Sequence, residues 1–171
     1  TYSQSWQSTK DSYTSGWENS YGLFFNCYSA STGLTAILKS PVIDLSSSSK
    51  DMILSFYLYD ADEDDIKVYL STDGGATYES TLLLECAKIS GWQTIEIPLG
   101  AYKTESSVCI VWYGVSSYGY SRPTLDNVMI APAPSCAQAE NLSVTDVTQN
   151  DATLNWALVQ GKGAAAEEYA I

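Results

Sequence analysis

Two tyrosines and the only arginine of the chain lie in one short segment, Tyr118-Gly119-Tyr120-Ser121-Arg122. Tyr118 and Tyr120 offer flat apolar rings on which a sugar can stack, and the guanidinium of Arg122 is a forked donor suited to a carboxylate. We therefore predict that these three residues bind a ligand. The alternative is that Arg122 pairs with a nearby carboxylate while the tyrosines cover a sheet edge.

A run of acidic residues could hold a metal. Asp60, Asp62 and Asp64 recur at every second position, a spacing that can gather oxygen ligands around Ca²⁺. An EF-hand is excluded, because Asp65 and Ser71 stand where that loop needs Gly and Glu. A calcium loop of another type and a solvated acidic turn that discourages edge pairing both fit the run.

The charge balance narrows the classes of partner. The chain has 20 acidic and 8 basic residues, a formal net charge of −12 and no histidine. Phosphate backbones and anionic membranes attract clustered Lys and Arg, so the sequence argues against nucleic acid and against a membrane surface. The lack of histidine removes Ser-His-Asp and Cys-His catalysis and His-ligated zinc.

Targeting signals are not evident in the sequence. No apolar run approaches the roughly 18 residues of a membrane helix, so we expect no membrane insertion in this segment. No signal peptide is visible and the chain begins with Thr1, from which we expect a processed product or a piece of a longer protein.

The sequence does not decide whether the four cysteines form disulfides or remain thiols. Cys27, Cys86, Cys109 and Cys136 include no C-x-x-C pair, so the sequence does not support a zinc knuckle or a thioredoxin-type site. An even number allows two disulfides with three possible pairings. Buried thiols in strands are the alternative, because cysteine is among the residues most often buried.

Alternating apolar and polar residues predict short strands that position these groups. Within 51–59, Leu54, Phe56 and Leu58 face one way while Tyr57 and Tyr59 face the other. The segment 107–114 is apolar on both faces, which predicts a strand in the middle of a sheet. Further strands are expected at 21–28, 34–40, 65–71, 81–87, 92–99 and 125–131. Eight or nine such strands predict an all-β fold, an antiparallel two-sheet sandwich or jelly roll.

The composition changes at Pro132 and Pro134, which cannot continue a central strand and which stiffen a linker. A second alternating pattern follows, with Leu154 and Trp156 on one face. We therefore predict a first domain at 1–131, a linker at 132–137, and the truncated start of a second β-sandwich at 138–171. Two complete strands are too few for an independent sandwich.

Four motifs occur in a characteristic order. They are L-x-S-P-x-I-D-L at 38–45, S-T-D-G-G at 71–75, a tryptophan at Trp92 and L-D-N-V at 125–128. Over roughly 16–130 the chain resembles the cleaved-adhesin, MAM-like jelly-roll modules of bacterial surface proteins and secreted proteases. The resemblance implies a jelly roll that binds carbohydrate or protein, or that accompanies a catalytic domain, without being an enzyme itself.

The resemblance also implies a structural Ca²⁺ with one ligand from the final strand, here Asp126, and a partner carboxylate near the N-terminus, where Glu18 is the nearest candidate. From the residues alone, Asp126 could ligate a metal or tie down a loop. Such an ion would stabilise the fold and perform no chemistry.

The segment 135–171 is similar to the first strands of a fibronectin type III domain, with Trp156 as its core tryptophan. Together these features predict a non-catalytic binding or adhesion module of a secreted or cell-surface protein, one that recognises a glycan or an extracellular protein and is joined to further domains. The alternatives are a structural spacer beside a catalytic domain and, third, a small glycoside hydrolase with paired carboxylates.

Overall fold

The computed structural model of the chain describes residues 6–9, 15–61, 65–79, 81–86, 89–119, 122–134 and 139–158. It divides into two compact units, Thr1–Ala131 and Pro132–Ile171. Among the described residues, no helix is both long and apolar enough to cross a membrane.

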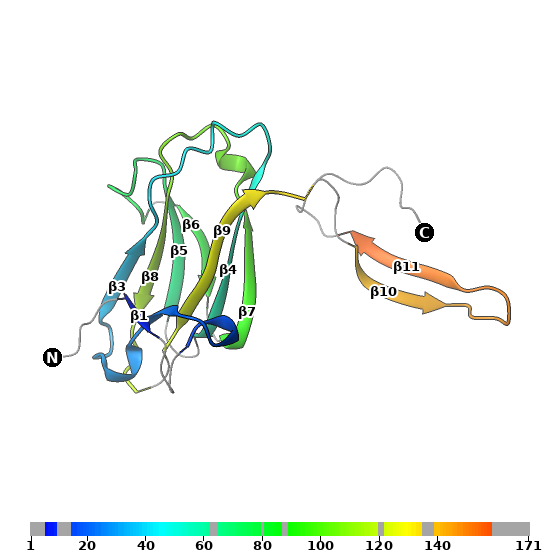
Figure 1. Cartoon of the computed structure of the whole chain (residues 1–171), viewed down its shortest axis with the longest axis horizontal. Helices are drawn as coiled ribbons and strands as arrows, with labels where there is room; N and C mark the ends of the chain where they lie inside the picture. Colours follow the sequence, from blue (N-terminus) through cyan, green and yellow to red (C-terminus); the bar gives the residue numbers. More distant parts are fainter. Residues whose placement is uncertain are drawn as a thin grey trace. The chain divides into compact units, whose positions relative to one another are not determined.

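The first unit is built from two antiparallel sheets (Figure 1). The five-stranded sheet has the order β1 (Trp6–Thr9), β2 (Gly22–Phe25), β9 (Thr124–Pro132), β4 (Met52–Ala61) and β7 (Ile89–Pro98). The four-stranded sheet has the order β3 (Thr35–Lys39), β8 (Cys109–Val115), β5 (Asp65–Ser71) and β6 (Leu82–Cys86). Short 3-10 turns lie at Trp17–Asn19, Cys27–Ser29 and Gly100–Tyr102. This architecture confirms the predicted all-β jelly-roll sandwich.

The core lies between the sheets and follows the predicted alternation. Leu54, Phe56 and Leu58 on β4 are fully buried, and Phe56 meets Trp112 of β8 edge to face, with ring centroids 5.8 Å apart. Burying each such side chain contributes about 1.5–3 kcal/mol to folding. The alternation predicted for β5 is confirmed as well, because Ile66, Val68 and Leu70 are fully buried.

Strand β8 lies between β3 and β5, as its apolar sequence predicts. Cys109 and Val111 are buried on one of its faces, and Ile110 on the other. Gly114 permits a close approach: a Cβ at this position would lie 2.6 Å from the Phe25 ring, so only glycine fits there.

The motif at 38–45 extends the edge of the four-stranded sheet after β3 ends. Ser40 accepts a hydrogen bond from the backbone N–H of Ile110 through its hydroxyl oxygen, at 2.9 Å. Three residues further on, Ile43 exchanges backbone hydrogen bonds of 2.8 and 2.9 Å with Val108. The connector between β3 and β4 is thereby held along β8.

The motif at 71–75 forms the turn after β5. The carboxylate of Asp73 accepts hydrogen bonds from the hydroxyls of Ser71 and Thr77 and from the Thr77 backbone N–H. The Ser71 hydroxyl in turn accepts from the N–H of Gly75, whose φ of +89° favours glycine.

Three of the cysteines lie in the described part of the chain, and Cys136 lies outside it. Cys27, Cys86 and Cys109 are buried, and Cys86 and Cys109 are free thiols. Burial raises the pKa of the Cys86 thiol to about 12, so this thiol is not reactive at neutral pH.

The second unit is described as one hairpin of β10 (Ala139–Thr145) and β11 (Thr153–Leu158) (Figure 1). Val144 stands opposite Leu154, and both side chains are exposed. Leu142 and Trp156 are exposed as well. These four apolar side chains of the hairpin are therefore exposed.

We predict that Asp73→Ala lowers the melting midpoint at neutral pH and that the difference from the wild type shrinks in acid. The hydroxyl of Ser71, followed by the hydroxyl and N–H of Thr77, holds the pKa of the Asp73 carboxyl well below its ordinary value of 3.8. A lowered folded-state pKa stabilises the fold above the unfolded value, and the gain is lost as the pH falls below about 3.8.

Thermal melts at several pH values check this prediction. Ser71→Ala removes the first of these donors and should move the midpoint in the same direction. A gap between wild type and Asp73→Ala that stays constant from neutral pH to pH ~2 would contradict the account.

Candidate functional site

Four aromatic residues gather on the outer face of the five-stranded sheet. Trp17, Tyr57, Tyr59 and Trp92 form this group, here called the sheet-face cluster. The alternation that turns Leu58 inward turns Tyr57 and Tyr59 outward, and the register of β4 and β7 sets Trp92 directly opposite Tyr59. The ring centroids of Tyr59 and Trp92 are 5.1 Å apart.

Trp17 joins the cluster from a segment that lies far away in the sequence. Its ring meets Tyr57 with a centroid distance of 5.0 Å and Trp92 with a distance of 5.9 Å, both edge to face. Trp17 remains 37% exposed and Tyr59 36% exposed, so two of the four rings present substantial surface to solvent.

Asp126 holds the segment that carries Trp17. One carboxylate oxygen, Oδ2, accepts the backbone N–H of Trp17 and the hydroxyl of Ser20, each at 2.8 Å. The other, Oδ1, accepts the N–H of Asn127 at 2.7 Å. Of the two roles that the sequence allowed for Asp126, the described contacts are those of a carboxylate that ties down a loop.

Polar side chains continue the outer face beside the sheet-face cluster. The register sets Thr94 opposite Tyr57, and Glu96 opposite Ser55. Thr94 and Glu96 are exposed, and Ser55 is half-buried. The surface therefore joins aromatic faces to hydroxyl and carboxylate groups, a combination that can stack on the C–H face of a sugar ring and hydrogen-bond to its hydroxyls.

The predicted loop site is only partly described, because Tyr120 lies outside the described residues. Tyr118 is 64% exposed, and its backbone N–H donates to the Thr32 hydroxyl at 3.2 Å. The Arg122 guanidinium lies 5.8 Å from the ring centroid of Tyr28, a cation–π distance. Tyr118 and Arg122 thus both contact or approach the segment that follows β2.

Another aromatic group lies on the outer face of the four-stranded sheet. Tyr69, Tyr78 and Tyr113 have centroid distances of 6.3 to 6.5 Å, and the Lys39 ammonium lies over the Tyr78 ring. Burial, with a smaller effect of the neighbouring Glu79 carboxylate, raises the pKa of Tyr78. All three rings are half-buried, so this group is less accessible than the sheet-face cluster.

The predicted calcium ligands are not brought together by anything described. Asp62 and Asp64 lie outside the described residues. Within the residues that are described, no group of three or more His, Cys, Asp or Glu side chains could hold a metal ion. Calcium at Asp126, Asp62 and Asp64 stays a prediction.

Sequence reasoning missed the sheet-face cluster, although part of its signal was visible. The outward positions of Tyr57 and Tyr59 follow from the alternation in β4. The arrival of Trp17 does not, because it depends on a hydrogen bond to Asp126, which lies 109 positions away.

The comparisons with known proteins identify the fold. No family model matches the chain, and no curated protein does. The structure is similar to a cleaved adhesin domain of Lys-gingipain from Porphyromonas gingivalis. The TM-score is 0.53 at 17% identity, over 67% of this chain and 76% of that chain. The chain therefore shares the fold of a cleaved adhesin domain.

Two further structures are similar. The glycoside hydrolase domain of Endo-D from Streptococcus pneumoniae matches with a TM-score of 0.52 at 11% identity, over 92% of this chain and 26% of that one. A family 30 carbohydrate-binding module from a Clostridium thermocellum cellulosomal cellulase matches with a TM-score of 0.49 at 16% identity, over 77% and 84%. Likeness at such identities bears on the fold alone.

We predict that Asp126→Ala destabilises the chain by about 1–3 kcal/mol, because two N–H groups and a hydroxyl lose a charged acceptor. Chemical denaturation measures the loss. Asp51→Ala is the matched control, since Asp51 pairs with Lys103 at 3.6 Å on an exposed surface. This control should change stability by less than about 0.5 kcal/mol. Equal losses in the two variants would contradict the anchoring role.

The family resemblance predicts that calcium stabilises the fold. A melting midpoint that falls when a chelator is added, and recovers with excess CaCl₂, is the expected result, because a ligand bound only by the folded state raises its stability. The same midpoint in chelator and in calcium would contradict a structural ion.

Proposed function

We propose that this chain is a non-catalytic carbohydrate-binding module of a secreted or cell-surface protein, and that the sheet-face cluster is its binding surface. One observation carries the proposal: Trp17, Tyr57, Tyr59 and Trp92 form a contiguous aromatic group that stays partly open to solvent. A purely structural sheet has no need to keep a tryptophan 37% exposed beside three other aromatic rings.

The mechanism is stacking and hydrogen bonding without covalent chemistry. The exposed faces of Trp17 and Tyr59 receive the apolar face of a sugar ring, and the hydroxyl of Thr94 with the carboxylate of Glu96 bonds to its hydroxyl groups. The hydrogen bonds to Asp126 fix the backbone of Trp17 before the ligand arrives, so less conformational entropy is lost on binding.

Neutral glycans suit the electrostatics of the chain. A net charge of −12 repels acidic ligands and leaves an uncharged sugar unaffected. The fold shared with a domain named as an adhesin supports a place outside the cytoplasm, where such modules meet glycans or the proteins that carry them.

The loop of Tyr118, Tyr120 and Arg122 is the second candidate surface. Two observations support it. Tyr118 is 64% exposed, and the Arg122 guanidinium lies over the Tyr28 ring, so a cation lies beside an aromatic face. The spacer role is the alternative in which neither surface binds. We further propose, from the sequence pattern, that 138–171 begins a fibronectin type III-like domain.

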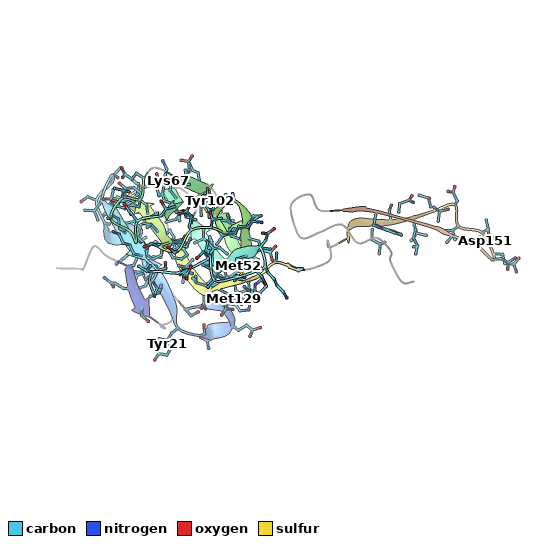
Figure 2. The ribbon with its side chains drawn as sticks, turned by 90° about the horizontal axis from the view of Figure 1, so that it is seen from above. Tyr21, Met52, Lys67, Tyr102, Met129 and Asp151 are labelled. Carbon is cyan, nitrogen blue, oxygen red and sulfur yellow. The ribbon has the colours of Figure 1, made fainter. Side chains whose placement is uncertain are left out.

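A glycan array tests the proposal with the wild type, Trp17→Ala, Tyr59→Ala and Tyr118→Ala. We expect Trp17→Ala and Tyr59→Ala each to weaken binding to the best glycan by about tenfold or more, as removal of a central aromatic residue does. Tyr21→Ala is the matched control, because Tyr21 is 72% exposed and projects away from the ribbon (Figure 2).

The outcomes separate the hypotheses. Loss of binding in Tyr118→Ala alone would move the site to the loop. Equal signals from all variants on every bound glycan would remove both surfaces, and no binding by the wild type would leave the spacer role.

A further inference from the structure

An apolar cavity of about 320 Å³ opens between the two sheets. Met52 and Leu54 of β4 and Val128 and Ile130 of β9 line it from one sheet, and Ile110 and Trp112 of β8 line it from the other. The β3–β4 connector closes a further side. The space is partly open to solvent, so a ligand can reach the apolar side chains that line it.

The cavity lies beside a strand edge that no described strand occupies. Strand β2 pairs with β9 only at Thr124 and Leu125. On that side the Trp17 N–H and the Ser20 hydroxyl bond to Asp126, and the rest of β9, from Asn127 to Pro132, has no partner among the described strands. Strand β4 lies on the other side of β9. A bare edge presents a row of backbone N–H and C=O groups that can receive another strand.

The side chains of this edge are turned toward the cavity by one backbone irregularity. Asn127 has a φ of +49°, which shifts the alternation after the buried Leu125. As a result Val128 and Ile130 line the cavity, whereas Met129 does not. Val128 is an apolar side chain that lines an apolar space and is nevertheless 44% exposed.

We propose that this cavity and the free edge of β9 form a groove that binds an extended peptide strand of a partner protein. The strand adds to the five-stranded sheet beside β9, and its alternate apolar side chains fill the cavity. Such strand addition takes affinity from main-chain hydrogen bonds and specificity from the pockets that receive alternate side chains.

The negative charge around the groove favours a basic peptide strand as its occupant. Exposed Asp44 lines the cavity and Asp126 directly precedes the free edge, while the whole chain carries a net charge of −12. A second copy of this chain would bring the same negative charge to the groove. A strand with basic residues beside its apolar ones is complementary. The groove is distinct from the sheet-face cluster, which lies on the outer face of the same sheet.

NMR titration of the ¹⁵N-labelled full chain tests the assignment. The probe is the capped peptide Lys-Thr-Val-Thr-Val-Thr-Val-Thr-Lys, and the control peptide carries serine in place of every valine. We expect the valine peptide to shift the amides of Val128–Ala131 and the Trp112 indole N–H, with a Kd of about 1 mM or tighter, and the serine peptide to leave them unmoved.

Two variants on β9 form a matched pair. Val128→Asp puts a charge at the mouth of the cavity and should weaken peptide binding at least about tenfold, since a charge in an apolar site is costly. Met129→Asp adds the same charge to the neighbouring residue, which is 56% exposed and does not line the cavity. This variant should change the Kd by less than about twofold.

Several results would overturn the proposal. They are the absence of shifts at β9 with the valine peptide, equal shifts with both peptides, or equal affinity in Val128→Asp and Met129→Asp. A dimer in light scattering that Val128→Asp dissociates would make a second copy the occupant. Hydrogen exchange of a longer stretch of the same polypeptide, measured without peptide, tests a further occupant. If the β9 amides are protected there, a strand of that polypeptide fills the groove and not a partner protein.

Discussion

The pairing of β4 with β7, which keeps one register from Ile53 to Tyr59, is the constraint on which the rest of the first unit depends. Because side chains alternate along a strand, the register that buries Phe56 against Trp112 is also the one that turns Tyr57 and Tyr59 outward beside Trp92. A slip by one residue would expose the core of β4 and bury the tyrosines. The same hydrophobic burial thus fixes the core and the candidate binding surface.

The sequence predicts the strands well because burial of alternate residues is a local pattern. Leu54, Phe56 and Leu58 are read from spacing alone, and the uninterrupted apolar run of β8 identifies a central strand. Trp17 could not be placed in this way. Its position depends on Asp126, which is distant in sequence, and on Gly16, where the atoms of a side chain would collide with that carboxylate. A loop that folds across a sheet leaves no periodic signal.

For the predicted site residues, too, the sequence indicates the type of chemistry but not the contacts between residues that are distant in the chain. Tyr118 and Arg122 are close in sequence, but in the described contacts each lies against the segment that follows β2 and not against the other. The sequence predicts Asp126 either as a metal ligand or as the anchor of a loop. In the described contacts its carboxylate accepts from three donors, all of them protein groups. Residue type indicated that Asp126 matters, but only the fold shows what it contacts.

Asp126 lies between the two candidate binding surfaces of the five-stranded sheet, the sheet-face cluster and the groove beside β9. Through Oδ2 it holds Trp17 on the outer face, and it directly precedes the free edge of β9. A strand added beside β9 would therefore lie next to the group that fixes Trp17. If such a strand alters the geometry of Asp126, the affinities of the outer face and of the groove are coupled, and linkage requires the coupling to be the same in both directions. A sugar that binds more tightly in the presence of the peptide must strengthen peptide binding by the same factor, because the free energy of the complex with both ligands does not depend on the order in which they bind.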